Sequence, residues 1–206
     1  MLTMERNQKR WRISIALGLV LAIVLTCSFS SFAAVCGAIR QDTLRLHILA
    51  NSNSEADQAL KLEVRDAILE QAGDLFDGAQ DKQQAEQQLS GRLSQIRQIA
   101  EGTLRAAGCD DPVEVALVER YFDTTRYPES GLTLPAGRYD AVQVRIGDAA
   151  GKNWFCVLFP PLCVPVASDQ TELYTEEEQR VTEGGYEIRF ALVEWIERLK
   201  EQRAEG

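Results

Sequence analysis

The stretch YDAVQVRIGDAAGKNWFCVLFPPLC covers Tyr139–Cys163 and combines the clearest strand pattern of the chain with its most distinctive apolar run. Tyr139–Ile146 alternates valine and isoleucine with polar or small side chains, which is typical of a half-buried strand. Gly147–Lys152 contains two glycines and resembles a hairpin loop that leads into Trp154–Phe159. The sequence therefore predicts a β-hairpin whose second strand is rich in aromatic residues.

A proline pair, Pro160–Pro161, follows the aromatic strand, and proline is excluded from the middle of helices and central strands. Cys156 and Cys163 lie on either side of this pair. An oxidising exterior would permit a disulfide between them; the alternative is two buried thiols that act as small apolar side chains. Trp154 and Phe155 either pack against a closing helix or form an exposed patch for a partner. The two arrangements can coexist if alternate residues of the strand face opposite sides.

The N-terminus carries four basic residues, the last of which is Arg12, and then an uncharged stretch, Ile13–Ile39. This pattern predicts a signal peptide, with small-residue cleavage sites ending at Ala33 or Ala38, or a retained transmembrane anchor. Cleavage is the favoured alternative. Both place the basic end in the cytoplasm and the rest of the chain outside. We therefore divide the chain into residues 1–39, the signal or anchor, and residues 40–206, the extracytoplasmic domain.

The predicted extracytoplasmic domain is acidic. Without the first 39 residues it keeps 18 basic and 30 acidic side chains, a net charge of −12. Such a charge repels phosphate backbones and anionic lipid headgroups, so nucleic acid is not expected as a partner. A cationic or apolar patch on another protein is the natural complement, and any membrane contact is expected through an uncleaved N-terminal segment.

Thr43–Ala50 alternates as a half-buried strand and carries His47 on its outer side. Ser54 and Asp57 have the spacing of a capping box that opens a helix ending near Gly78. A second helix is expected over Lys82–Ala107, although Gly91 and Gly102 weaken it.

Pro112–Tyr121 is rich in valine and predicts a further strand. Residues 168–185 are acidic and form an expected connector, and residues 186–201 form an amphipathic closing helix. The order β-α-α-β-β-β-α predicts an α+β fold with a small, mostly antiparallel sheet and helices on one face.

Recognisable catalytic chemistry is sparse. His47 is the single histidine and precedes the three cysteines of the predicted domain, so a Cys–His hydrolase using Cys156 or Cys163 is kept only as the alternative function. One histidine and scattered cysteines do not make a tetrahedral metal set. Asn51-x-Asn53-x-Glu55 imitates a calcium loop but lacks its glycine and its closing glutamate. The sequence predicts neither a metal nor a cofactor.

Three segments carry a resemblance to a known family: LRLHILANSNSEADQALKLEVRDAIL (Leu44–Leu69), LPAGRYDAVQVRIG (Leu134–Gly147) and NWFCVLFPPLC (Asn153–Cys163). They closely resemble the stage II sporulation protein R family of endospore-forming bacteria. The resemblance implies a non-catalytic signalling protein, exported from the forespore into the space between the two membranes. There it would trigger a membrane-embedded aspartic protease that removes the pro-sequence of the sporulation factor sigma-E.

The resemblance does not identify which residues contact the protease. Our candidate contacts therefore rest on physical grounds at positions within the matching motifs. Two groups are expected to bind the partner, one near the first turn and one at the aromatic corner: His47, Asn51, Asp57, Trp154, Phe155, Pro160 and Pro161.

Overall fold

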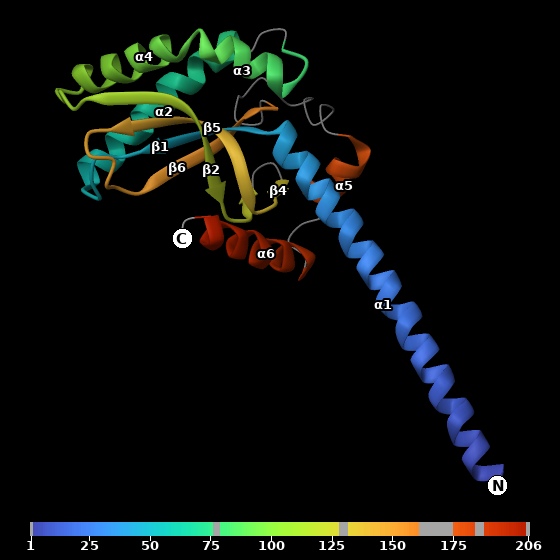
Figure 1. Ribbon diagram of the computed structural model, residues 1–206. Helices are drawn as coiled ribbons and strands as arrows, with labels where there is room; N and C mark the ends of the chain where they lie inside the picture. The colour runs from blue at the N-terminus through green and yellow to red at the C-terminus, as the bar shows by residue number, and fades with distance from the viewer. Residues whose placement is uncertain (1, 76–78, 128–131, 161–174, 184–187, 205–206) are drawn as a thin grey trace.

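The computed structural model describes residues 2–75, 79–127, 132–160, 175–183 and 188–204. Figure 1 shows a body built around one main sheet, from which the long N-terminal helix α1 extends far to one side. Helices and strands both contribute to this body, so the predicted α+β class is confirmed.

The main sheet has four strands in the order β2-β5-β1-β6. β2 (Val113–Phe122) pairs antiparallel with β5 (Gly137–Ile146), which pairs parallel with β1 (Leu44–Leu49). β1 in turn pairs antiparallel with β6 (Asn153–Phe159). The two strands of the predicted hairpin are thus not paired with each other, because β1 lies between them; the hairpin prediction is wrong.

The loop of residues 147–152 explains how β5 and β6 can be close in sequence yet separated by a strand. It crosses the end of β1, where the Ala150 N–H donates to the Asn51 carbonyl at 3.0 Å. The Asp148 N–H donates to the Asn51 side-chain oxygen at 2.9 Å. Gly147 has φ of 55°, and a Cβ there would collide with the Asn51 amide, so this crossing requires glycine.

Three helices cover one face of the sheet, as Figure 1 shows: α2 (Glu55–Leu75), α3 (Lys82–Ser90) and α4 (Leu93–Ala106). Their apolar sides and the facing strand residues form the main core, which includes Leu46, Ile48, Val64, Ile68, Leu89, Ile96, Leu104, Val142 and Val144. The single helix predicted over residues 82–107 is two helices. Gly91 caps the first, so Leu89 and Ile96 both reach the core from separate segments.

A smaller group of elements lies around the other end of the sheet. It contains β3 (Thr125–Tyr127), β4 (Leu132–Leu134), α5 (Glu176–Glu183) and α6 (Ile188–Ala204). The structure differs here from the predicted acidic connector, since residues 176–183 are helical.

A capping box explains the start of α5. The Thr175 N–H donates to the Glu178 carboxylate at 2.7 Å, and the Glu178 N–H donates back to the Thr175 hydroxyl at 3.4 Å. This signal is present in the sequence as Thr175-x-x-Glu178.

The N-terminal helix α1 (Leu2–Asp42) contains one segment, Arg10–Asp42, whose length and composition would allow it to cross a membrane. Its last turns belong to the body: Phe32, Cys36 and Ile39 are buried. Arg40 also donates to the Ala136 carbonyl at 3.0 Å. The boundary we predicted between residues 39 and 40 therefore falls inside α1, within a part that packs on the rest of the body.

The closing helix α6 docks with an unexpected side. Phe190 and Val193 are buried, and the Phe190 ring meets the Phe32 ring edge-on with 5.1 Å between centroids. The face that the sequence pattern indicates as apolar is exposed instead. Trp195 is 62% exposed and does not cover Trp154, which packs on the main core below the Arg65 guanidinium. The alternative in which Trp154 packs against this helix is therefore wrong.

Candidate binding face of the sheet

The sheet has a second face, opposite α2, α3 and α4, and its central residues are charged or aromatic. We call this surface the aromatic face, and define it as Arg45 and His47 of β1, Arg120 and Phe122 of β2, Tyr139 and Gln143 of β5, and Phe155 of β6. Residues paired directly across neighbouring strands point to the same side of a sheet. Each of the four strands therefore contributes to this face.

Arg45 lies at the centre of the aromatic face and is fully buried. Its guanidinium carbon is 3.9 Å from the Phe122 ring centroid, 5.0 Å from that of Phe155 and 5.1 Å from that of Tyr139. Ring faces attract cations, and an arginine plane stacks on them well. Three rings from three different strands thus enclose one permanently charged group.

The polar partners of Arg45 come from β3. One terminal nitrogen, Nη2, donates to the Tyr127 hydroxyl at 2.9 Å and lies 3.3 Å from the Thr125 hydroxyl. Burial raises the pKa of Tyr127, and the nearby guanidinium opposes that rise. Among the described residues, Nε and Nη1 of Arg45 have no hydrogen-bond partner, and no carboxylate lies within ion-pair distance. In the part of the chain that the structure describes, aromatic rings and hydroxyls rather than a counter-ion therefore surround this charge.

His47 follows two positions later on β1 and is 8% exposed. The Gln143 amide nitrogen lies 3.2 Å from its Nδ1, so the two side chains share a hydrogen bond. Burial, together with the charges of Arg120 and Arg45, lowers the pKa of His47 to about 4. At neutral pH this imidazole is uncharged and a weak base, which makes it poorly suited to general acid–base catalysis.

This lowered pKa predicts a pH dependence of folding stability. The unfolded chain takes up a proton at His47 near pH 6.5, whereas the folded chain does so only near pH 4. Neutral His47 therefore contributes fully to the free energy of unfolding above pH 6.5. As the pH falls toward 4, this free energy decreases by about 2 to 3 kcal/mol. Urea unfolding at pH 7.5 and pH 4 should show this loss in the wild-type chain.

The variant His47→Gln provides the comparison, since glutamine keeps a polar partner for Gln143 but does not titrate. Its free energy of unfolding should fall less over the same pH range, while carboxylates that titrate in both proteins cancel in the difference. Equal pH dependence in the two proteins would contradict the assigned pKa.

The two predicted contact residues of the first turn, Asn51 and Asp57, take part in the local structure. Asn51 holds the loop that crosses β1, and the Asp57 carboxylate accepts from the Ser52 hydroxyl. The Asp57 N–H donates to the Ser54 hydroxyl at 3.1 Å, which forms the predicted helix cap of α2. Both residues lie at the end of β1, beyond the aromatic face.

The remaining candidate contacts are divided between the two faces. Phe155 is the register partner of His47 on the aromatic face, whereas its neighbour Trp154 pairs with Ile48 on the helix-covered side. Neighbouring residues of this strand thus face opposite sides of the sheet. Pro160 is buried just beyond β6, and Pro161 lies outside the described residues. The partner-binding role of these residues stays a prediction.

Cys156 is disulfide-bonded, whereas Cys27, Cys36 and Cys109 are free. Its predicted partner, Cys163, lies outside the described residues, so the pairing stays a prediction. Cys156 also pairs in register with Leu46 and thus faces the side of the sheet opposite His47. A bonded sulfur on the other face cannot act as the nucleophile of a Cys–His pair.

Sequence reasoning missed Arg45, Arg120, Phe122 and Tyr139 as members of this face. The strand alternation already places Arg45 on the same side as His47, and this was the signal available. The aromatic residues come from strands far away in sequence, and their arrival at one point depends on the strand order. Among the described residues, no group of three His, Cys, Asp or Glu side chains could hold a metal ion.

These features describe an α+β domain that is joined to an apolar N-terminal helix and has a largely buried, arginine-centred aromatic face on one side of its sheet. The chain belongs to the stage II sporulation protein R family, whose model matches residues 40–169. It is 32% identical over 187 residues to the stage II sporulation protein R of Bacillus subtilis (strain 168), covering 78% of this chain and 83% of that protein. No solved structure matches it. The protein is therefore a sporulation protein of a family that is not a known class of enzymes.

Proposed function

We propose that this protein activates, from outside the cytoplasm, a membrane-embedded aspartic protease that removes the pro-sequence of sigma-E during sporulation. Membership in the family supports the sporulation role. The apolar helix α1 supports export, since it would carry the body across the forespore membrane into the intermembrane space. The protein acts by binding alone, and it activates only as far as it binds the active state of the protease more tightly.

The aromatic face is the observation that carries the binding mode. Arg120 is exposed and Phe155 is half-buried, so both are available at the rim of a well-packed aromatic cluster. Arginine and aromatic side chains dominate the binding energy of protein interfaces. The whole chain is acidic, with a net charge of −9, and Arg45 is fully buried, so Arg120 is the positive charge that this face offers to a partner. An apolar or acidic extracytoplasmic segment of the protease is the matching surface.

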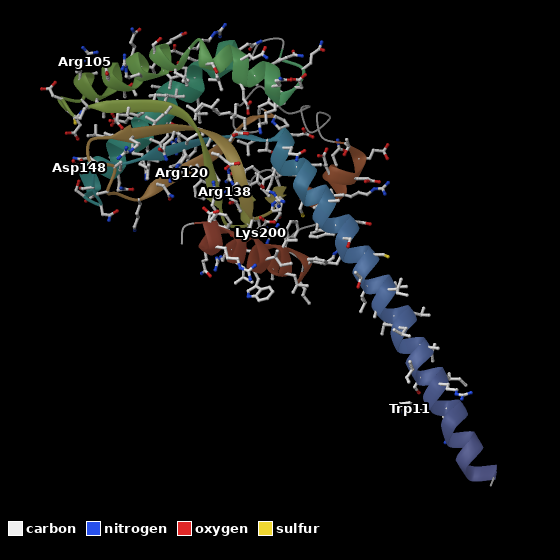
Figure 2. All side chains as sticks on the ribbon, viewed as in Figure 1. Trp11, Arg105, Arg120, Arg138, Asp148 and Lys200 are labelled. Atoms are coloured by element: carbon white, nitrogen blue, oxygen red, sulfur yellow. The ribbon has the colours of Figure 1, made fainter. Side chains whose placement is uncertain are left out.

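A charge reversal on this face should abolish activation. We expect Arg120→Glu to stop precursor cleavage, because it places a carboxylate where an acidic partner surface would dock. The matched control is Arg105→Glu: Arg105 is also exposed, but it lies on α4 on the other side of the sheet from Arg120, as Figure 2 shows. The full chain, the protease and the sigma-E precursor are co-expressed in a non-sporulating host, and cleavage is followed by immunoblot.

The possible outcomes test the proposed contact surface separately from the proposed activator function. Cleavage with the wild-type chain and with Arg105→Glu, but not with Arg120→Glu, supports both. Normal cleavage with Arg120→Glu rejects the aromatic face as the contact surface. If the wild-type chain does not promote cleavage, the activator function itself is rejected. Equal protein levels and equal resistance to limited proteolysis show that the variants are folded.

A further inference from the structure

The outer side of α6 carries an apolar stripe that no described element covers. Ile188 is 82% exposed, Leu192 47%, Trp195 62% and Leu199 36%. Their spacing of four, three and four residues places them on one face of the helix. The opposite side is the one that docks, through Phe190 and Val193 against α1 and through the Glu201 ion pair with Arg138. The stripe therefore points away from the body.

The position of α6 along α1 indicates what this stripe meets. Arg12 is the last basic residue before the apolar stretch, and Phe32, which contacts Phe190, lies twenty residues further on. At about 1.5 Å per residue this separation is roughly 30 Å, the thickness of the hydrocarbon core of a bilayer. When Arg12 lies at the inner surface, the first turns of α6 lie at the level where α1 leaves the hydrocarbon on the outer side.

A hollow at the same level has a mixed lining. It has a volume of about 350 Å³ and lies between α1, α5 and α6, where apolar side chains line it together with the polar residues Ser28, Ser31, Glu177, Arg180 and Arg189. Hydroxyl and guanidinium groups are suited to the polar layer of a membrane, not to its hydrocarbon. Figure 1 shows α6 on the side of the body from which α1 extends. The part of α1 that lines this hollow and the apolar stripe of α6 thus lie next to each other.

From these positions we infer that α6 is an interfacial helix, which lays its stripe of Ile188, Leu192, Trp195 and Leu199 into the outer leaflet of the membrane that α1 crosses. Helices with one apolar side lie in the membrane plane, with that side buried at the boundary between headgroups and acyl chains. Tryptophan is favoured at this depth because its ring is apolar and its N–H is polar. The body is then held at two points, by α1 through the membrane and by α6 on its surface.

Depth-dependent fluorescence quenching tests this placement. The full chain is reconstituted into vesicles of phosphatidylcholine whose acyl chains carry bromine close to the headgroup. A protein with Trp195 as its single tryptophan, made by Trp11→Phe and Trp154→Phe, reports on α6. A second protein that keeps only Trp11, at the cytoplasmic end of α1 as Figure 2 shows, reports on correct insertion. We expect a loss of Trp195 emission comparable with that of Trp11.

A stripe variant identifies the cause of any quenching. Ile188→Ser with Leu199→Ser removes two exposed apolar side chains without touching the buried contacts of α6, so the body stays folded. In this variant the Trp195 emission should recover while aqueous acrylamide gains access to the ring.

Two results would overturn the inference. One is a Trp195 that bromolipids do not quench and acrylamide does. The other is a Trp195 protected from both quenchers, because another protein chain would then cover the stripe. Trp11 must be quenched by the lipid in every case, which shows that α1 has inserted.

Discussion

Ile39→Asp is expected to unfold the body, although residue 39 lies in what the sequence presents as a signal or anchor segment. Ile39 is fully buried in a cluster with Leu132, Leu134 and Val157. A carboxylate there has no cation to pair with inside the cluster, so the free energy of unfolding should fall by about 3 to 5 kcal/mol. Thermal unfolding of the detergent-solubilised full chain, followed by near-UV circular dichroism, measures the effect.

Two control variants separate this packing from general effects on α1. Ile39→Val should cost only about 1 kcal/mol, because it removes one methylene group from the same site. Leu25→Ala changes an exposed residue of α1 and should leave the melting temperature of the body unchanged. If Ile39→Asp melted like the wild-type chain, the last turns of α1 would not be part of the folded body.

The same cluster has a consequence for the two cleavage sites. Cleavage after Ala33 would remove Phe32 but keep Cys36 and Ile39, whereas cleavage after Ala38 would remove two of these three buried side chains. An exported chain that starts at Ala34 therefore keeps most of the packing between α1 and the body. Either cleavage removes the Phe32 ring that contacts Phe190, and the later site also removes Cys36 from the same cluster.

Arg45→Glu is expected to have the second large effect, a loss of about 4 kcal/mol or more. The substitution reverses a fully buried charge against three ring faces, which attract cations and repel anions. The hydroxyls of Tyr127 and Thr125 can donate to a carboxylate, but they do not offset the repulsion. Urea unfolding monitored by circular dichroism gives the free energy of unfolding for this variant.

Arg45→Met is the informative partner of this variant. Methionine fills much of the same space and removes a buried charge that lacks a counter-ion among the described residues, so its cost should stay within about 1 to 2 kcal/mol. A loss as large as that of Arg45→Glu would show that the positive charge itself stabilises the fold, in contradiction to this expectation.

The elements that depend on short-range patterns could be predicted from the sequence. The helix cap at Ser54, the alternation that separates Trp154 from Phe155, and the strands β1 and β5 all follow from residues within one turn or one strand. The helix α5 belongs to the same group, because Thr175-x-x-Glu178 has the spacing of a helix cap.

The features that depend on the arrangement of distant segments could not be predicted in this way. A six-residue loop is equally compatible with a hairpin and with a crossing over one strand, and the hydrogen bond that Asn51 accepts in the crossing comes from a distant part of the sequence. Helical periodicity shows that Ile188 and Trp195 share a side of α6, but not which side meets the body. Arg45 is buried only because rings from three other strands converge on it.

A single residue, Thr43, separates the end of α1 from the start of the central strand β1, and its hydroxyl donates to the Ile39 carbonyl at 2.5 Å. The body therefore cannot swivel freely on a tether. If α1 stays in the bilayer, every copy of the protein holds the sheet at the same height above the lipid and in the same rotation about the axis of α1. Each residue added to α1 would turn that presentation by about 100°. With such a rigid junction, the body can contact a receptor in the opposite membrane only if the distance between the two membranes matches the height of the body.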